Sequence, residues 1–198
     1  LMSKLTDNQT EKYSRQIIIK KIGISGQKKI LNSSICIVGC GGLGSSAAQY
    51  LLMTGIGNIM LIDNDLINLS NLNRQTLFFE KDIGKSKVDT LKRNLQEISP
   101  EAKIKAIKKK INKKNIDNYL SQYKIILDCT DNFQSRYLIN EYCFKKKKIL
   151  VSAALQNFDL QASVFASWKK GQYPCYNCIF PKTHNTNNQS CDEQGIAA

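Results

Sequence analysis

The sequence predicts an α/β domain built on a doubly wound, mostly parallel sheet, with helices on both faces and an antiparallel extension near the C-terminus. Three observations support this fold class. Short apolar runs of strand length alternate with longer stretches of helical spacing along most of the 198 residues. A glycine-rich turn directly follows the first apolar run. No internal repeat or linker divides the chain, whose length suits one domain. Apolar strands joined by helices favour parallel pairing with both sheet faces covered.

The N-terminal segment is predicted to be helical. Thr6-Asp7-Asn8-Gln9 has the pattern of a capping box, in which two side chains satisfy backbone N–H groups at the start of a helix. This short helix leads into residues 13–20, and a second helical turn fits residues 26–31.

The first strand and the helix after it frame the glycine cluster. Residues 35–38 form a short apolar run bounded by polar and glycine residues, which predicts a buried parallel strand. Gly39 to Gly44 follow. Residues 45–55 then have helical spacing, and Gly55 ends the predicted helix.

The same alternation continues to residue 168. Further strands are predicted at residues 58–63, 103–108 (an edge strand), 124–128, 149–154 and, antiparallel, 159–168. Helices are predicted at residues 85–98, 113–122 and 132–147. Residues 64–80 are polar and irregular, and the polar tail from about residue 181 is expected to be a mobile loop.

One domain is expected over residues 1–198, with a helical segment at 10–32, a core at 33–168 and a C-terminal part at 169–198. Leu1 precedes Met2, and the last residues, DEQGIAA, stop without an evident terminal helix. We therefore expect the chain to be truncated at its C-terminus relative to a longer reading frame.

The composition excludes several classes of protein. The net charge is +13, but only four of the 29 basic residues are arginine, and the lysines accompany abundant Ile and Asn. This pattern indicates compositional drift, so we expect no nucleic-acid partner. No uncharged apolar run approaches the length of a membrane span, and the polar N-terminus lacks a signal-peptide core. A cytoplasmic location without a membrane partner is expected, with seven reduced cysteines rather than a disulfide framework.

Residues 39–44 match the G-x-G-x-x-G pattern between a predicted strand and a predicted helix. Gly39, Gly41 and Gly44 allow a tight turn and a close approach of the backbone, and the helix N-terminus presents N–H groups to phosphate. Asp63 closes the next strand, 19 residues after Gly44, where a carboxylate can accept hydrogen bonds from ribose hydroxyls. These features predict a Rossmann-like nucleotide site, and an NAD-dependent oxidoreductase explains them equally well.

Polar side chains after the predicted strands favour triphosphate chemistry instead. Arg74 lies in the polar segment that follows Asp63, and its guanidinium suits bidentate contacts with phosphate. Lys87 begins the next helix and offers a point charge to a polyphosphate. Asp131 follows the strand that ends at Asp128 and can hold a hydrated Mg²⁺ together with phosphate oxygens. A hydride-transfer site has little use for such a set.

Short motifs in a fixed order extend this pattern. They are YSRQ at 13–16, the glycine loop at 39–44, Asp63-x-Asp65, SNLNRQ at 70–75, Gly84-x-x-Lys87 and DCTDN at 128–132. Together they resemble the MoeB/ThiF/HesA family, the bacterial relatives of ubiquitin-activating enzymes, in register from about residue 10 to 196.

The resemblance implies ATP-dependent adenylylation of the C-terminal glycine carboxylate of a small ubiquitin-like sulfur-carrier protein, with release of pyrophosphate. The residues that it implies in contact with ATP or its Mg²⁺ are Gly42, Asp63, Ser70, Asn71, Arg74, Lys87, Asp131 and Asn132. It also suggests a homodimer in which Arg15 reaches the phosphates of the neighbouring subunit. Arg15, Arg74, Lys87 and Asp131 would then be the catalytic residues.

The family forms acyl adenylates without a base, and the composition agrees with this. The single histidine, His184, lies in the predicted mobile tail. The nucleophile is a carboxylate that is already ionised at pH 7, so catalysis reduces to positioning and charge stabilisation.

Three cysteines near the C-terminus leave their roles open. Cys175 and Cys178 form a C-x-x-C pair, which is half of a tetrahedral zinc site. The similar proteins carry a second such pair nearer the C-terminus, so structural zinc is conditional here and two free thiols are the alternative. A redox role is disfavoured because the pair follows Pro174 in a predicted loop. Cys191 resembles in position a cysteine that handles sulfur or forms a thioester in some members, although an incidental thiol fits equally well.

Two other functions stay open at this stage: an NAD(P)-dependent oxidoreductase and a non-catalytic, truncated member of the family. The carrier is also open. It would be the molybdopterin-synthase small subunit, which the N-terminal segment favours slightly, or a thiamine sulfur carrier, with which Cys191 is compatible.

Overall fold

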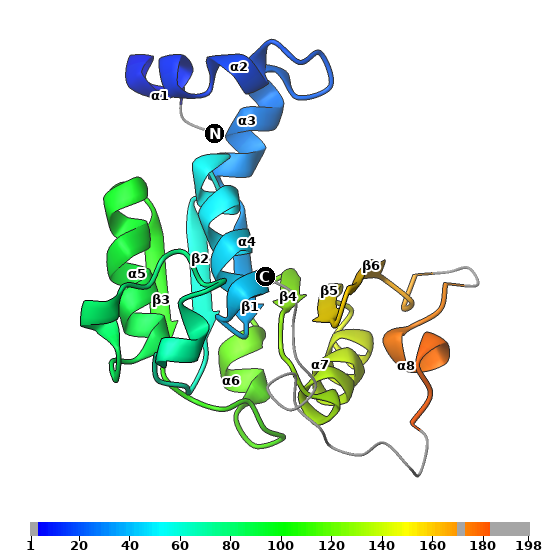
Figure 1. The fold of residues 1–198 in the computed structure, drawn as a ribbon. Coiled ribbons are helices and arrows are strands. Elements are labelled where there is room, and N and C mark those ends of the chain that lie inside the picture. Colours follow the sequence, from blue (N-terminus) through cyan, green and yellow to red (C-terminus); the bar gives the residue numbers. More distant parts are fainter. Residues whose placement is uncertain (1–3, 170–172, 183–198) are drawn as a thin grey trace.

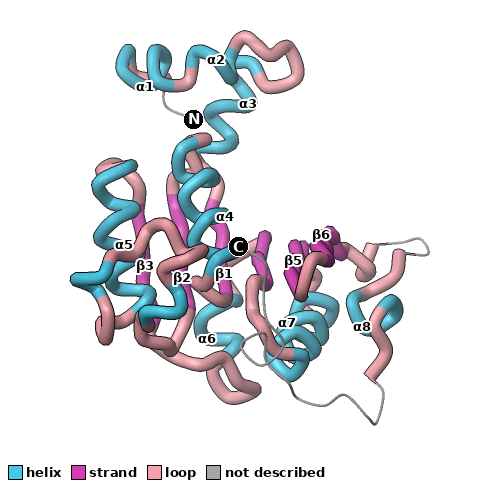
Figure 2. Tube along the Cα trace, in the orientation of Figure 1, coloured by secondary structure: helices cyan, strands magenta, loops and turns pink. Residues whose placement is uncertain are grey.

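The structure, a computed structural model, describes residues 4–169 and 173–182 of the chain. A six-stranded sheet with the order β3-β2-β1-β4-β5-β6 forms its centre (Figures 1 and 2). The strands are β1 (Ser34–Val38), β2 (Asn58–Ile62), β3 (Lys103–Ile107), β4 (Ile125–Asp128), β5 (Ile149–Gln156) and β6 (Asp159–Phe165). All neighbours pair in parallel except β5 and β6, which are antiparallel. The predicted fold class is confirmed, including the edge position of β3.

Helices connect the strands. They are α1 (Asp7–Lys12), α2 (Ser14–Ile17), α3 (Gly23–Leu31), α4 (Gly42–Met53), α5 (Lys87–Ile98), α6 (Ile116–Leu120), α7 (Phe133–Lys145) and α8 (Tyr176–Ile179), with 3₁₀ turns at Leu69–Asn71 and Glu80–Asp82. No helix in the described part of the chain combines the length and the apolar character needed to cross a bilayer.

Three helix starts differ from the prediction by three residues. α3 begins at Gly23 rather than at residue 26. α4 begins at Gly42 rather than at residue 45, because the glycine turn itself enters the helix. α6 begins at Ile116 rather than at 113, because the side chains of Asn112 and Asn115 bond to backbone N–H groups and form a turn before it.

Side chains alternate along the strands and divide the core in two. Ile35 and Ile37 of β1 pack in a cluster with α4 and α5. Cys36 and Val38, their neighbours on the same strand, pack in a second cluster with α6 and α7. Because successive strand residues point to opposite faces, both faces of the sheet are apolar and both are covered by helices. The sheet is doubly wound, as predicted.

The N-terminal helices lie at the amino ends of the strands (Figure 1). The Thr6 capping box forms as predicted, with Gln9 as its second member. Tyr13 is 1% exposed, and the side chains of Gln16 and Gln27 donate hydrogen bonds to the carbonyl of Thr54 at the end of α4. These contacts attach α2 and α3 to the end of the sheet opposite the carboxyl ends of the strands.

The strand order creates a crevice at those carboxyl ends. From β1 the chain winds outward through β2 and β3, then returns to place β4 on the other side of β1. The loops after β1 and β4 therefore leave in opposite directions. In open α/β sheets, such a switch point is where ligands bind.

Candidate functional site

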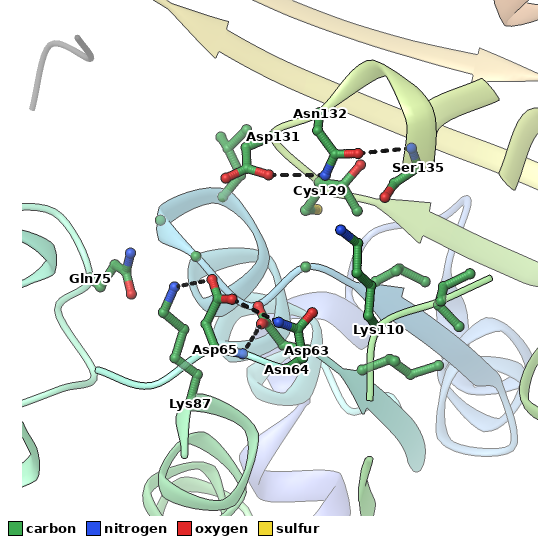
Figure 3. A pocket seen from close by; sticks show the side chains of 18 of the residues that line it. Asp63, Asn64, Asp65, Gln75, Lys87, Lys110, Cys129, Asp131, Asn132 and Ser135 are labelled. Atoms are coloured by element: carbon green, nitrogen blue, oxygen red, sulfur yellow. Dashed lines mark hydrogen bonds and ion pairs between the residues drawn. The ribbon is translucent and has the colours of Figure 1, made fainter. Parts of the chain in front are cut away.

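A pocket of about 510 Å³ opens at this switch point (Figure 3). Its walls come from the loops after β1, β2, β3 and β4 and from the start of α5. The predicted site residues that line it are Gly39, Gly41, Gly42, Asp63, Asp65, Asn71, Arg74, Lys87, Asp131 and Asn132. Of the other predicted residues, Gly44, Ser70 and Arg15 do not line it.

The glycine turn at the end of β1 is tightly packed on its rear side. Gly39 has a φ of +89°, and a Cβ there would lie 2.5 Å from the carbonyl oxygen of Cys129. A Cβ on Gly44 would lie 1.9 Å from the carbonyl oxygen of Gly39. Gly44 therefore serves the packing of α4 against the turn, while Gly41 and Gly42 face the pocket. The first N–H groups of α4 point toward this end of the pocket, which favours an anion.

Asp63 follows β2 and supports the glycine turn. Its Oδ2 accepts a hydrogen bond from the backbone N–H of Cys40 at 2.7 Å, and its Oδ1 accepts one from the N–H of Asp65 at 2.8 Å. Burial raises the pKa of Asp63 above the ordinary aspartate value, although these two backbone N–H groups oppose the shift. Each carboxylate oxygen has a second lone pair, so Asp63 can still accept hydrogen bonds from a ligand.

Lys87 is a buried cation at the pocket wall. It is the first residue of α5, which Ser86 caps, and it is 7% exposed. Its Nζ lies 2.9 Å from Oδ2 of Asp65 (Figure 3). Its backbone N–H donates to the carbonyl of Asp65. Asp65 therefore fixes Lys87 at two points and directs its charge into the pocket.

Arg74 flanks the glycine turn from the other polar loop. A Cβ on Gly42 would lie 3.6 Å from Cγ of Arg74. The Arg74 Nη1 donates to the carbonyl of Ser70 and to Oδ1 of Asn73, both at 3.0 Å. Ser70 itself is exposed and acts on the pocket through this carbonyl. The buried Asn71 accepts the N–H of Asn68 through its side chain and shapes the loop.

Asp131 and Asn132 stand at the N-terminus of α7. Asn132 caps the helix by accepting the N–H of Ser135 at 2.9 Å, and its Nδ2 donates to Oδ1 of Asp131 at 3.2 Å. Asp131 is exposed at the pocket rim. A carboxylate and an amide at this rim suit a hydrated Mg²⁺ that takes its other ligands from phosphate and water.

A buried polar network supports the loop that carries Asp131. Asp128 accepts hydrogen bonds from the N–H and hydroxyl of Thr130. Arg136, which is 6% exposed, donates to the carbonyls of Thr130 and Ala153. Burial raises the pKa of Asp128, and the Arg136 charge and the Thr130 bonds oppose that shift. Asp128 thus caps the turn after β4, and Arg136 was not predicted from the sequence.

Other pocket residues were also missed by the sequence analysis. Three of them follow β3, whose carboxyl end lies at the same edge of the sheet: Lys109, Lys110 and Ile111. Their position after a parallel strand would have allowed their prediction. Gln75 lines the pocket although it is only 2% exposed. Cys129 also lines it, but burial and the neighbouring Asp128 raise its pKa to about 12. Cys129 is therefore a protonated thiol at neutral pH and no nucleophile.

The C-x-x-C pair lies apart from the pocket, beside α7. The two Sγ atoms of Cys175 and Cys178 are 3.4 Å apart, and Cys175 precedes the one-turn helix α8. The predicted loop is wrong here, because Tyr176 is buried against α7 and Asn140 accepts its N–H. Partial burial raises the pKa of Cys175, but hydrogen bonds from Asn140 and Cys178 outweigh this and lower it.

The described residues contain no group of three or more His, Cys, Asp or Glu side chains that could hold a metal ion. Two thiols at this separation fit half of a tetrahedral zinc site. Cys191 and His184 lie outside the described residues.

Arg15 lies far from the pocket of its own chain. It is an exposed residue of α2, at the amino ends of the strands (Figure 1). Any contribution of Arg15 to a phosphate site must therefore be made to another copy of the chain.

Comparison with known proteins identifies the family. Residues 13–198 match the ThiF family. The chain belongs to the ThiF family. Its curated relatives include the adenylyltransferase and sulfurtransferase MOCS3 of Drosophila persimilis, with 42% identity over 90% of this chain, and that of Culex quinquefasciatus, with 39% identity over 91%. The chain spans about 40% of the length of these relatives, at 39% and 40% respectively.

Solved structures of similar proteins share the fold of this chain. Escherichia coli MccB with ATP has a TM-score of 0.70 and 31% identity, over 84% of this chain and 50% of MccB. The E. coli tRNA N6-threonylcarbamoyladenosine dehydratase TcdA, in complex with ATP, has a TM-score of 0.72 and 27% identity, over 80% of this chain and 64% of TcdA.

Proposed function

We propose that this ThiF-family chain adenylylates the C-terminal glycine carboxylate of a small ubiquitin-like sulfur carrier, using ATP. One observation carries the proposal: Arg74, Lys87 and Asp131 converge with the glycine turn on one pocket at the switch point. MccB and TcdA, whose structures contain ATP, support ATP as the nucleotide. The MOCS3 relatives, named adenylyltransferases, support the reaction class.

The geometry suits a reaction that needs charge stabilisation and no base. The carrier carboxylate, ionised at pH 7, attacks the α-phosphorus of ATP, and the bond to the bridging oxygen breaks to release pyrophosphate. The α4 N-terminus, Arg74 and Lys87 surround the phosphates with fixed positive charge, and Asp63 would bind the ribose hydroxyls. A Mg²⁺ held at Asp131 and Asn132 would neutralise charge on the leaving pyrophosphate.

A protein-sized substrate is supported by the β5–β6 ribbon. Val151 and Leu155 of β5 pair directly with Val164 and Leu160 of β6 and share one face of the ribbon. Leu160 is 68% exposed and Val164 is 69% exposed, and Leu155 lines the pocket. This apolar face therefore leads to the nucleotide pocket, where a folded carrier could dock while its tail enters.

Replacing Leu160 and Val164 together with serine should raise the KM for the carrier about 10-fold, because apolar area at the contact is lost. Binding of a non-hydrolysable ATP analogue should not change. Phe144→Ser, at an exposed apolar residue of α7, is the control and should leave the KM unchanged. An unchanged KM in the double variant would exclude the ribbon as the docking face.

ATP–pyrophosphate exchange tests the proposed function directly. Exchange should appear with the full-length protein only when a carrier ending in Gly-Gly is added, and it should disappear when the carrier lacks its last glycine. The molybdopterin-synthase small subunit and a thiamine sulfur carrier are to be compared; the resemblance favours the first. Absence of exchange with either, together with tight NAD(P) binding, would favour an oxidoreductase instead.

Three further features belong to the same proposal. The protein acts in the cytoplasm as a homodimer, in which Arg15 of one subunit contacts the phosphates bound by the other. Three exposed residues supply apolar surface for that contact: Ile18 and Ile19 in the turn after α2, and Ile24 in α3. A structural zinc would bind Cys175 and Cys178 together with two further ligands.

A further inference from the structure

Gln75 has an unusual environment for a glutamine. Its side chain lines the pocket, yet the residue is only 2% exposed. Its Oε1 is buried and has no hydrogen-bond partner among the described residues. Its Nε2 lies 3.7 Å from the position that a Cβ on Gly41 would occupy, beside the glycine turn. A buried acceptor without a partner costs about 1–3 kcal/mol, and because this amide lines the pocket a bound ligand can supply the donor.

The nucleotide phosphates do not supply the missing donor. At neutral pH a triphosphate offers acceptors and almost no donors. The nearby cation Lys87 is bonded to Asp65, and in Figure 3 Gln75 and Lys87 lie on the same side of the pocket, opposite Lys110. The donor that meets Oε1 can then come from the ribose or adenine of the nucleotide, from water or from the second substrate. The second substrate is a peptide chain end, which carries one N–H per residue.

We propose that the Gln75 amide binds the backbone of the carrier's terminal glycine. Oε1 accepts the glycine N–H, and Nε2 donates to one oxygen of its carboxylate. An extended residue presents its N–H and its C=O to the same side, so one amide can meet both. The contact holds the attacking carboxylate next to the glycine turn. This inference rests on the proposed adenylylation.

The test uses two carriers that differ in one atom. One ends in the natural Gly-Gly; in the other, the last glycine is replaced by glycolic acid, so an ester oxygen replaces the terminal N–H. Pyrophosphate exchange by the full-length wild-type enzyme should fall about 10-fold in kcat/KM with the ester carrier. With the natural carrier, the kcat/KM of the Gln75→Met variant should also be about 10-fold below that of the wild type. With the ester carrier it should fall little further, because both changes remove the same hydrogen bond.

The control is Gln27→Met. Gln27 is fully buried and its Oε1 also lacks a partner among the described residues, but it lies outside the nucleotide pocket. Gln27 also helps to attach α3 through the Thr54 carbonyl, so the readout of this control is the ratio of kcat/KM for the two carriers, which should equal that of the wild type. The dissociation constant for a non-hydrolysable ATP analogue, measured without carrier, should change less than about 2-fold in Gln75→Met. Weaker analogue binding by the same factor as kcat/KM would make Gln75 a nucleotide or magnesium ligand and overturn the proposal.

The remaining outcomes are also decisive. Equal activity of the wild type on both carriers overturns the proposal, whether or not Gln75→Met folds. Gln75→Glu, which keeps the size and an acceptor oxygen, should retain the ester sensitivity; its loss there would contradict the assigned acceptor. If the wild type shows no exchange with the natural carrier, the proposed function itself fails. Equal exchange with the natural and the ester carrier would instead overturn only the proposed role of Gln75.

Discussion

Arg74→Ala should lower carrier-dependent ATP–pyrophosphate exchange roughly 10²- to 10³-fold, the usual cost of removing one preorganised donor from a charged transition state. Arg74 lies against Gly42 at the N-terminus of α4, where the phosphates are expected, and the Ser70 carbonyl and Asn73 fix its guanidinium. The loss should appear mainly in kcat, since charge on the phosphates redistributes in the transition state. Initial rates at several carrier concentrations separate kcat from KM.

Two further variants test whether the loss of exchange is specific to the guanidinium of Arg74. Arg74→Lys keeps the positive charge but loses the planar fork, so it should recover only part of the rate. Arg93→Ala removes an arginine outside the pocket that bonds the buried Asp82. It should lower the melting temperature while exchange at 25 °C stays near the wild-type rate. Near-normal exchange in Arg74→Ala would contradict the assigned phosphate contact.

The fold could be predicted from the sequence because its information is local and periodic. Ile35 and Ile37 alternate with Cys36 and Val38, and two helix layers cover the two faces that this alternation defines. The carboxyl ends of parallel strands meet at one edge, so the sequence alone predicts that residues such as Asp63 and Asp131 lie near one another. Boundaries were less accurate where side chains cap a turn, as Asn112 does before α6.

The supporting residues of the site could not be predicted, because their roles depend on partners distant in sequence. Arg136 lies in the middle of a helix, and no local pattern says that its guanidinium meets the carbonyls of Thr130 and Ala153. In the sequence, Gln75 is only the last residue of the SNLNRQ motif. Its burial could not be predicted, because it depends on how two loops pack beside Gly41. Ser70 shows the converse. Ser70 belongs to the SNLNRQ motif, but its carbonyl contacts Arg74 and its side chain does not line the pocket.

Gly44→Ala should destabilise the protein by about 3 kcal/mol or more, because the new Cβ would lie 1.9 Å from the carbonyl oxygen of Gly39. That oxygen belongs to the backbone of a turn that is itself packed against Cys129, so it cannot move away freely. A loss of this size corresponds to a melting temperature lower by roughly 10 °C for a chain of this length. Thermal unfolding followed by circular dichroism measures it.

Gly42→Ala separates packing from ligand binding in the same turn. A Cβ on Gly42 would meet Arg74 Cγ at 3.6 Å, an ordinary contact, and alanine favours the helix that begins there. Its stability should therefore equal or exceed that of the wild type. The same methyl group would project into the pocket at the α4 N-terminus and weaken binding of a non-hydrolysable ATP analogue at least about 10-fold. Wild-type analogue binding in this variant would mean that the nucleotide does not approach the turn at Gly42, whereas a stable Gly44→Ala protein would mean that α4 can shift away from Gly39.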